Sequence, residues 1–421
     1  MTPSDPRPEP RWRAFLATVL TVAFVGILTL TSAPVELPQD RVSFTCLLGF
    51  QYQGLRDVFS NTLLFLPLGW TLRHWLRPAH AIVLCVAATC GIEALQATVI
   101  AGRDSSLRDI LSNTIGGALG VWFFSHWRGL RWPEHARSLR LGTLAAAGWI
   151  GLLAVSAAGN RLALSTLPLY GHWAGELAYY DHYPGTVLSV NVNGWSPPNG
   201  AMPEPAPLRE AMMRDSFLLS VRVVSGRTTG RPAPMFFVSD QRGKEQVFLG
   251  QDRRALGLHI RNRFESWGLR GLDVRLPLFP GREPGDTVLI EAGLDDRTLL
   301  LRAVTARERA EVRLPQTVGW GWAAMLPFRY AVWHEWTVVN ALWLASLTLP
   351  LGYWLGRASP LAGLLLSLLA VGLGLTLIPF MAHAAGTAMF EWIGGLSGAL
   401  LSWAVGAHSR GQPPWTPPTE S

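Results

Sequence analysis

The sequence is poor in charged residues and almost devoid of lysine. Only 15% of its 421 residues are charged, whereas soluble domains average about 25%. The formal net charge of +7 comes almost entirely from arginine, because Lys244 is the single lysine. Many of these arginines stand in short segments between apolar runs, where the bias of membrane proteins for positive cytoplasmic loops places them. The composition therefore predicts a membrane protein and argues against a nucleic-acid partner.

Cysteine is also scarce. The chain has three cysteines, Cys46, Cys85 and Cys90, and none of them belongs to a Cys-x-x-Cys pair or to a His/Cys cluster with zinc spacing. We therefore expect small buried thiols and no metal site. No motif in the sequence names a cofactor.

Long apolar runs are plentiful, and each is close to the roughly 20 residues of a membrane helix. They cover residues 14–33, 58–76, 79–100, 110–126, 141–158, 332–355, 361–381 and 386–407. The first is long for a signal peptide, so we expect an uncleaved anchor. The runs predict an all-α polytopic membrane bundle of about eight helices: a four-helix membrane domain (14–128), a fifth helix (141–158) and three C-terminal helices (332–407).

The positions of the arginines predict the topology. The residues that mark the cytoplasmic side are Arg7, Arg11, Arg13, Arg73, Arg77, Arg128, Arg131, Arg137 and Arg140. Applied to a bacterial inner (cytoplasmic) membrane, this bias places the N-terminus (1–13) and the Pro-rich tail (408–421) in the cytoplasm. We expect that tail to be disordered and residues 160–328 to be extracytoplasmic.

Residues 160–328 change in character, because charged residues return and no apolar run reaches membrane length. Short stretches of β-type pattern follow one another between turn signals such as Asn193-Gly194. They are Thr186–Val192, Phe217–Val224, Met235–Val238, Val247–Leu249, Leu256–Ile260, Val274–Leu278 and Thr287–Ala292. Many short strands at this spacing predict an inserted, all-β antiparallel sandwich.

The run SFLLSVRVVS, followed by PMFFVSDQRG and QVFLGQDRRALGLHIRNR, resembles the concanavalin A/laminin-G-like group. The resemblance implies a jelly roll, and members of that group often bind glycans, sometimes with calcium. No ligand residue carries over to this sequence, so the function is implied by fold analogy alone. Asp295-Asp296 has the composition of a calcium ligand pair, but a solvated turn explains it more simply.

Polar residues gather in three of the apolar runs. Asp57 and Asn61 stand one helical turn apart at the start of the second run, and Asp109 and Asn113 repeat that spacing at the start of the fourth. Glu93 follows in the third run, about 10 Å below the outer surface at ~1.5 Å per residue.

Helix direction brings these residues together, because the connection between the third and fourth runs is short and makes them antiparallel neighbours. The candidate site in the outer leaflet consists of Asp57, Asn61, Glu93, Gln96, Asp109 and Asn113, with Arg103 and Arg108 above it.

Each residue has a structural and a functional interpretation. Asp57 and Asp109 suit helix caps, and Asn61, Gln96 and Asn113 suit hydrogen bonds between helices. Glu93 is harder to explain structurally, because a carboxyl at that depth costs on the order of 2–3 kcal/mol unless it is paired or protonated. The candidate catalytic residues are therefore Glu93, Asp57 and Asp109.

The motif DxxxNxxxFxPLG, followed by ExxQ and RxxxxxDxxxNxxGxxxG, resembles the VanZ-like family over residues 57–120. The resemblance implies a protein of the cell envelope and a link to glycopeptide (teicoplanin) resistance. The other polar residues of the candidate site, Asn61, Gln96, Arg103 and Asn113, are candidate substrate-binding residues beside the three carboxylates.

The last three apolar runs echo this pattern. Asn340 precedes Pro350-Leu-Gly352 as Asn61 precedes Pro67-Leu-Gly69, with four extra residues. Ile393-Gly394-Gly395 echoes Ile115-Gly116-Gly117, and Glu391 stands where Asn113 would. These residues indicate a degenerate, parallel second VanZ-like half, although glycines recur by chance as well.

Three functions fit these features. The first is recognition or modification of a surface glycan or lipid-linked headgroup at the outer leaflet, with membrane lipids as partners. The second is an enzyme on lipid-linked sugars with Glu93 as general acid or base. The third is a transporter coupled to protons or cations. Only the first needs the external domain, the second lacks a nucleophile or metal motif, and the third lacks charges across the bilayer.

Overall fold

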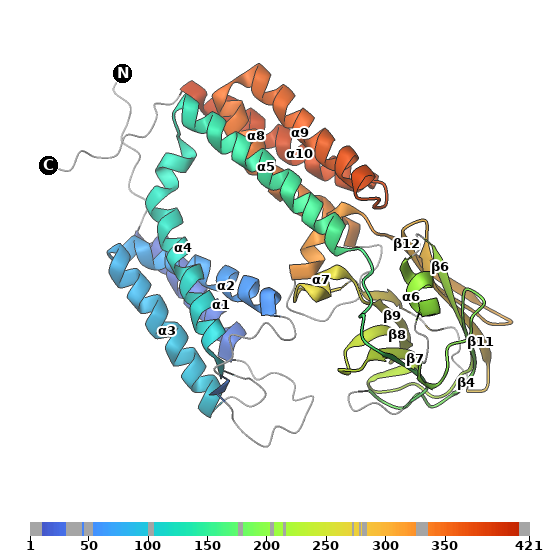
Figure 1. Cartoon of the computed structure of the whole chain (residues 1–421). Coiled ribbons are helices and arrows are strands. Elements are labelled where there is room, and N and C mark those ends of the chain that lie inside the picture. The colour runs from blue at the N-terminus through green and yellow to red at the C-terminus, as the bar shows by residue number, and fades with distance from the viewer. Residues whose placement is uncertain are drawn as a thin grey trace. The chain divides into compact units, whose positions relative to one another are not determined.

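The chain forms two compact units (Figure 1). The first comprises Met1–Pro133 and Pro413–Ser421, and the second comprises Glu134–Gln412. The structure, a computed structural model, describes residues 11–30, 44–45, 54–99, 105–175, 180–202, 206–213, 216–271, 273–277, 279, 284–325 and 336–411. Of the predicted disordered tail (408–421), residues 408–411 are helical, and residues 412–421 lie outside the described residues.

The described residues of the first unit form four long helices and one pair of two-residue strands. The helices are α1 (Arg11–Leu30), α2 (Gly54–Trp75), α3 (Pro78–Thr98) and α4 (Leu107–Arg131). Strand β1 (Phe44–Thr45) pairs in parallel with β2 (Ser105–Ser106) just before α4. Pro78 begins α3, where the missing N–H of proline costs no helical hydrogen bond.

Helices α2 and α4 approach one another at glycines. A Cβ atom built on Gly116 would lie 2.2 Å from the carbonyl oxygen of Thr62, and one on Gly120 would lie 2.1 Å from that of Leu66. No side chain fits at such distances, so the two backbones are in direct contact. This is how small residues let helices pack closely in a membrane.

The second unit contains α5 (His135–Gly159), α8 (Thr337–Ala358), α9 (Pro360–Met381) and α10 (Met389–His408). They share a core around Trp149 and Leu153 of α5. A short 3-10 helix, η1 (Val318–Met325), precedes α8, and another, η3 (Ser409–Gly411), follows α10. Here too glycines of one helix meet the backbone of another, since Cβ atoms on Gly394 and Gly398 would lie 2.2 Å from the carbonyl oxygens of Ala341 and Ala345.

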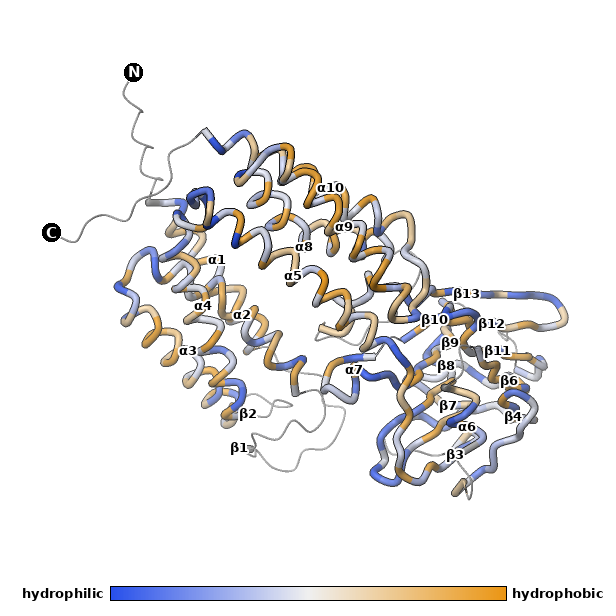
Figure 2. The backbone as a smooth tube through the Cα atoms, turned by 45° about the horizontal axis from the view of Figure 1, so that its top comes forward, coloured by the Kyte–Doolittle hydropathy of each residue, from blue (hydrophilic) through white to orange (hydrophobic). Residues whose placement is uncertain are grey.

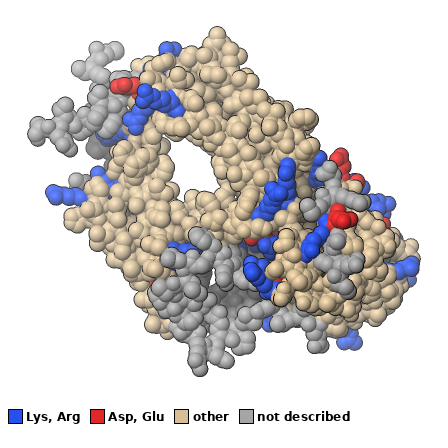
Figure 3. Space-filling model, in the orientation of Figure 1, with Lys and Arg blue, Asp and Glu red and all other residues tan. Residues whose placement is uncertain are grey.

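Each of the eight predicted runs corresponds to a helix of 20 to 25 residues in the described chain. Five of these helices are long and apolar enough to cross a membrane: Trp12–Leu30, Pro78–Thr98, His135–Gly159, Thr337–Ala358 and Pro360–Met381. Figure 2 shows apolar colour along much of α3, α5 and α9. In Figure 3 few charged side chains interrupt the surface of the helices. The structure thus has the character of a multi-pass membrane protein, and the count of eight spans stays a prediction.

The segment between α5 and α8 forms two antiparallel sheets. The six-stranded sheet has the order β10-β9-β8-β7-β3-β5 and the five-stranded sheet the order β13-β12-β11-β6-β4. The strands are β3 (Leu169–Trp173), β4 (Thr186–Val192), β5 (Gly200–Ala201), β6 (Phe217–Val224), β7 (Pro232–Asp240), β8 (Glu245–Asp252), β9 (Ala255–Ile260), β10 (Asp273–Leu276), β11 (Thr287–Asp295), β12 (Thr298–Val304) and β13 (Arg309–Pro315). Two short helices, α6 (Ala206–Met213) and α7 (Arg263–Ser266), interrupt the all-β pattern.

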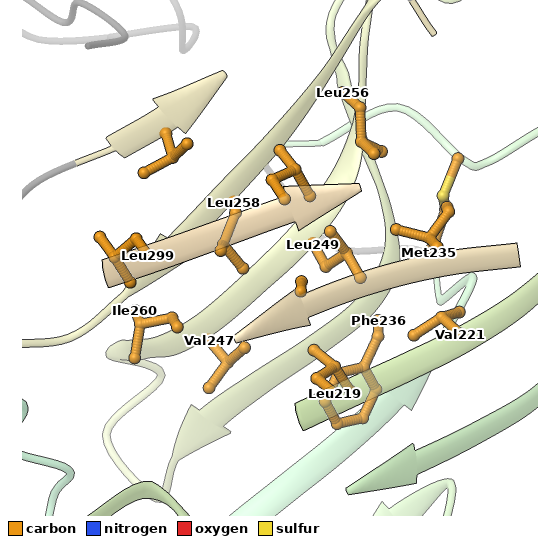
Figure 4. Close-up of a cluster of buried hydrophobic side chains, with 14 of the residues drawn as sticks. Leu219, Val221, Met235, Phe236, Val247, Leu249, Leu256, Leu258, Ile260 and Leu299 are labelled. Carbon is orange, nitrogen blue, oxygen red and sulfur yellow. The ribbon is translucent and has the colours of Figure 1, made fainter. Parts of the chain in front are cut away.

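The two sheets share one hydrophobic core. Alternate residues of β6 are buried because successive side chains of a strand point to opposite faces. Residues of both sheets meet in the close-up of Figure 4, where Leu219, Val221, Met235, Phe236, Val247, Leu249, Leu256, Leu258, Ile260 and Leu299 are labelled. Burial of this apolar surface holds the sheets together.

All seven predicted strand segments fall within or overlap strands of the two sheets, and the bounds of β4 and β6 agree exactly with the prediction. The prediction missed β3, β5, β12 and β13. Leu300 lies between Leu299 and Leu301 and faces away from the shared core, although it is as apolar as they are. The sequence of β12 therefore shows no alternation of apolar and polar residues there. The predicted turn at Asp295-Asp296 connects β11 to β12, and no group of His, Cys, Asp or Glu side chains in the described residues could hold a metal ion.

We expect Gly116→Ala to destabilise the first unit by about 1–3 kcal/mol, because the added methyl group overlaps the backbone of α2. The measurement is the thermal midpoint of the monodisperse full-length protein in detergent. Gly91→Ala is the matched control, since nothing lies within 4 Å of a Cβ at that position of α3. Equal midpoints for the two variants would contradict the close contact.

Candidate functional site

Charged side chains gather where α2 and α4 begin. Arg56 and Arg108 each lie 3.3 Å from a carboxylate oxygen of Asp57. Asn61, one turn along α2, donates a 2.8 Å hydrogen bond from Nδ2 to Oδ1 of Asp109. The pair of arginines and the pair of aspartates cancel in charge, which lowers the cost of holding them at the end of an apolar bundle.

The first turn of α4 is stabilised from another helix. Ser106 is the N-cap, and its Oγ accepts a 3.1 Å hydrogen bond from the backbone N–H of Asp109. In a capping box the acid at this position would accept the N–H of the cap residue in return. Here the Ser106 N–H donates instead to Oε2 of Glu93 on α3, at 2.9 Å. The carboxylate of Asp109 is thereby left available to Asn61.

A second group of polar residues lies deeper between α3 and α4. Glu93 is 3% exposed and Asn113 is 2% exposed, whereas the side chain of Asp57 is 31% exposed. Nδ2 of Asn113 donates a 2.9 Å hydrogen bond to Oγ1 of Thr89, one turn before Glu93 on α3. No described residue donates to Oδ1 of Asn113. The charged side chains of the site are therefore partly exposed, whereas the amide oxygen of Asn113 is buried.

The structure brings together five of the seven predicted site residues near the start of α4: Asp57, Asn61, Glu93, Asp109 and Asn113. A sixth lies nearby. Gln96 is buried, but its Nε2 donates to the backbone oxygen of Thr29 in α1 at 2.8 Å. Neither aspartate is the expected N-cap. Asp57 is the fourth residue of α2, and Asp109 is the third residue of α4, whose N-cap is Ser106. Arg103 lies outside the described residues.

Sequence reasoning overlooked Ser106 and Thr89. Ser106 was detectable, since Ser-x-x-Asp before an apolar run is the pattern of a capping box. Thr89 carried no such signal, because a threonine within an apolar helix commonly bonds to the backbone of its own helix.

The second unit has a comparable group around Glu391, which is 1% exposed. Oε1 of Glu391 accepts hydrogen bonds from the hydroxyl of Thr317 and, at 3.3 Å, from Nδ2 of Asn340. Oε2 accepts the backbone N–H of Ala388 at 3.2 Å. The indole N–H of Trp322 donates to Oδ1 of Asn340 at 2.5 Å. The segment that leaves the sheets thus supplies a donor to the carboxylate of Glu391, from Thr317, and another to its partner Asn340, from Trp322.

An ionic cluster lies on the six-stranded sheet. The imidazole of His259 contacts Asp273 through Nδ1 at 2.8 Å and Glu265 through Nε2 at 3.3 Å. Arg270 lies 2.8 Å from Asp273. Burial disfavours charge on His259, but the charges of Glu265 and Glu245 and the hydrogen bond with Asp273 outweigh it and raise the pKa of His259 well above 6.5. Because both ring nitrogens are engaged, the cluster has the features of a structural network.

The long apolar helices, packed through glycines and carrying buried polar groups near the start of α4, define the class of the protein as a multi-pass membrane protein. Residues 12–128 match the family model described as VanZ/LLP1. This part of the chain is therefore a VanZ-like domain, and it includes α1 as well as the three helices that carry the motif. No curated protein and no solved structure matches the chain.

We expect the sheets to lose stability as the pH rises above about 6.5. In this range unfolded chains release the proton of His259 while the folded protein keeps it, which costs about 1.4 kcal/mol of folding free energy per pH unit until the raised pKa is reached. His259→Gln removes this proton and should flatten the dependence. The measurement is the loss of β-sheet circular dichroism on heating the full-length protein at several pH values.

The exposed His182 provides the control, because His182→Gln should keep the pH dependence of the unsubstituted protein. A pH dependence that His259→Gln leaves unchanged would contradict the assignment.

Proposed function

We propose that this protein recognises the phosphate-bearing headgroup of a lipid-linked glycan in the outer leaflet of the bacterial inner membrane. The observation that carries the proposal is the pair of arginines, Arg56 and Arg108, on the same carboxylate at the start of α2 and α4. Guanidinium groups suit phosphate oxygens because they offer paired N–H donors in one plane.

The proposal extends to the whole membrane part and to the location of the sheets. All eight long helices span the bilayer, the termini are cytoplasmic and residues 160–328 are extracytoplasmic. The arginine distribution supports this arrangement. Helices α2 and α4 are less apolar than the five candidate spans because they carry charged residues, among them Asp57 and Asp109.

In this proposal the two sheets form a jelly roll that recognises the glycan attached to the lipid. The shared core and the exclusively antiparallel pairing between the strands of the described sheets support that interpretation. A link to glycopeptide resistance follows if the lipid is a cell-wall precursor, since both then concern the same surface molecule.

Glu93 has a positioning role in the proposal. Its contact with the Ser106 N–H fixes the start of α4 and hence the orientation of Arg108 and Asp109. This contact accounts for a buried carboxylate without chemistry. Catalysis by Glu93 and coupled transport remain alternatives, but the charge-balanced cluster near the starts of α2 and α4 favours recognition of a headgroup.

A topology test checks the location. Alkaline phosphatase fused after Gly159, at the end of α5, should be active, because the enzyme folds only outside the cytoplasm. A fusion after Pro133, between α4 and α5, should be inactive and is the matched control. An inactive enzyme after Gly159 together with an active one after Pro133 would invert the topology and contradict the proposal.

A binding test checks the function. The full-length protein in nanodiscs of phosphatidylcholine should bind a polyprenyl diphosphate. Arg108→Ala should weaken this binding about tenfold or more, since a hydrogen bond to a charged group contributes about 1.5–3 kcal/mol.

Arg73→Ala is the control, because Arg73 is a partly buried arginine near the other end of α2 that bonds to Ser125 and to the carbonyl oxygen of Leu76. Equal weakening by both substitutions would indicate unspecific charge attraction. No binding by the unsubstituted protein would refute the proposal.

A further inference from the structure

The polar groups of the two units occupy matching positions. Gly116 of α4 contacts the backbone at Thr62, and Gly394 of α10 contacts it at Ala341. The residue just before each contact on the partner helix is an asparagine, Asn61 in α2 and Asn340 in α8. The second pair of glycine contacts repeats the register four residues later in both units. The helix pairs α2/α4 and α8/α10 therefore pack by the same pattern.

This register assigns an equivalent to each buried acceptor. Asn113 and Glu391 both stand three residues before the first contact glycine. Helix α10 begins about one turn closer to its first contact glycine than α4 does. Glu391 is therefore also the third residue of its helix, as Asp109 is of α4. In each unit the asparagine of the partner helix donates to that third-position carboxylate, from Asn61 to Asp109 and from Asn340 to Glu391.

The two acceptors differ in what they receive. The carboxylate of Glu391 accepts the hydroxyl of Thr317, which belongs to the segment between the sheets and α8. Oδ1 of Asn113 is buried and accepts no hydrogen bond from a described residue, while its Nδ2 is held by Thr89. An unpaired buried acceptor carries a cost in free energy. A ligand that supplies a donor at this point recovers that free energy.

We infer that Oδ1 of Asn113 accepts a hydroxyl group of the bound headgroup, at the position where Glu391 accepts the hydroxyl of Thr317 in the second unit. The second half is then a degenerate VanZ-like copy whose site is filled by the protein's own chain. This inference rests on the proposed function and adds to it the chemical class of the ligand: a headgroup with an alcohol beside its phosphate. The alcohol belongs to a sugar or to glycerol.

The arrangement of the site supports that order of contacts. Arg108 and Asp57 lie at the partly exposed start of the helices, and Asn113 lies one turn further along α4 than Asp109. A headgroup that enters from this end meets the arginines with its phosphate and reaches Asn113 with its hydroxyl. Asp109 is already engaged by Asn61 and does not compete for the donor.

The test compares lipids that differ by the hydroxylated part, bound to the full-length protein in phosphatidylcholine nanodiscs. One pair is a polyprenyl diphosphate with and without an N-acetylhexosamine. The other pair is phosphatidylglycerol and phosphatidic acid. We expect the hydroxylated member of one pair to bind up to about tenfold more tightly, the upper range for one neutral hydrogen bond. The pair that shows the preference identifies the source of the alcohol.

Substitutions then locate the acceptor. Asn113→Leu, with a similar volume and no acceptor, should abolish the preference, so that both members of the pair bind equally. Asn113→Asp keeps an acceptor oxygen and should keep the preference. Thr89→Val removes only the partner of Nδ2 and is the matched control. Asn113→Ala provides the same reading if the leucine variant is not monodisperse.

The outcomes separate this inference from the proposed function. Equal binding of the members of both pairs, or a preference that survives Asn113→Leu or Asn113→Ala, overturns the inference and leaves headgroup binding intact. Failure of the unsubstituted protein to bind any of the four lipids refutes both. A preference lost equally in Thr89→Val and Asn113→Leu makes Asn113 a packing residue and also overturns the inference.

Discussion

Backbone contact at glycine is the constraint on which both helical units depend. In lipid, apolar side chains gain little by meeting one another, because the surrounding tails are equally apolar. Close approach of helices therefore needs residues without side chains, and Gly116 and Gly394 supply them. Once the backbones touch, the register of the two helices is set, and Asn61 or Asn340 lies next to the carboxylate at the start of the glycine-bearing helix, Asp109 in α4 or Glu391 in α10.

The polar groups at these contacts differ between the two units in how their acceptors are hydrogen-bonded. In the second unit Glu391 is satisfied from within the chain, by a threonine, an asparagine and the backbone N–H of Ala388, so it joins the segment leaving the sheets to the helices. In the first unit the charges are balanced, but the deepest acceptor remains open among the described residues. A group whose acceptors are hydrogen-bonded within the chain stabilises a fold, whereas an acceptor without such a bond among the described residues, beside paired arginines, suits a ligand.

Much of the candidate site could be predicted from the sequence. The spacing of Asp57 with Asn61 and of Asp109 with Asn113, combined with helix direction, was sufficient to place them at one end of the bundle. The individual contacts were not predictable. Glu93 bonds to the Ser106 N–H, and Gln96 bonds to α1. Which donor meets which acceptor depends on helix rotation and depth to within an ångström, and residue spacing does not determine these.

The sequence alone determined the positions of the eight long helices and of seven strand segments, because hydrophobic runs and alternation are local properties of the chain. It also carried the VanZ-like motif. It left β12 hidden, because Leu300 is apolar although it faces away from the shared core. Only the tertiary structure decided that Thr317 meets Glu391 across 74 residues of chain. That contact exists because the two sheets close on a common core and return the chain to α10, a result that no local pattern contains.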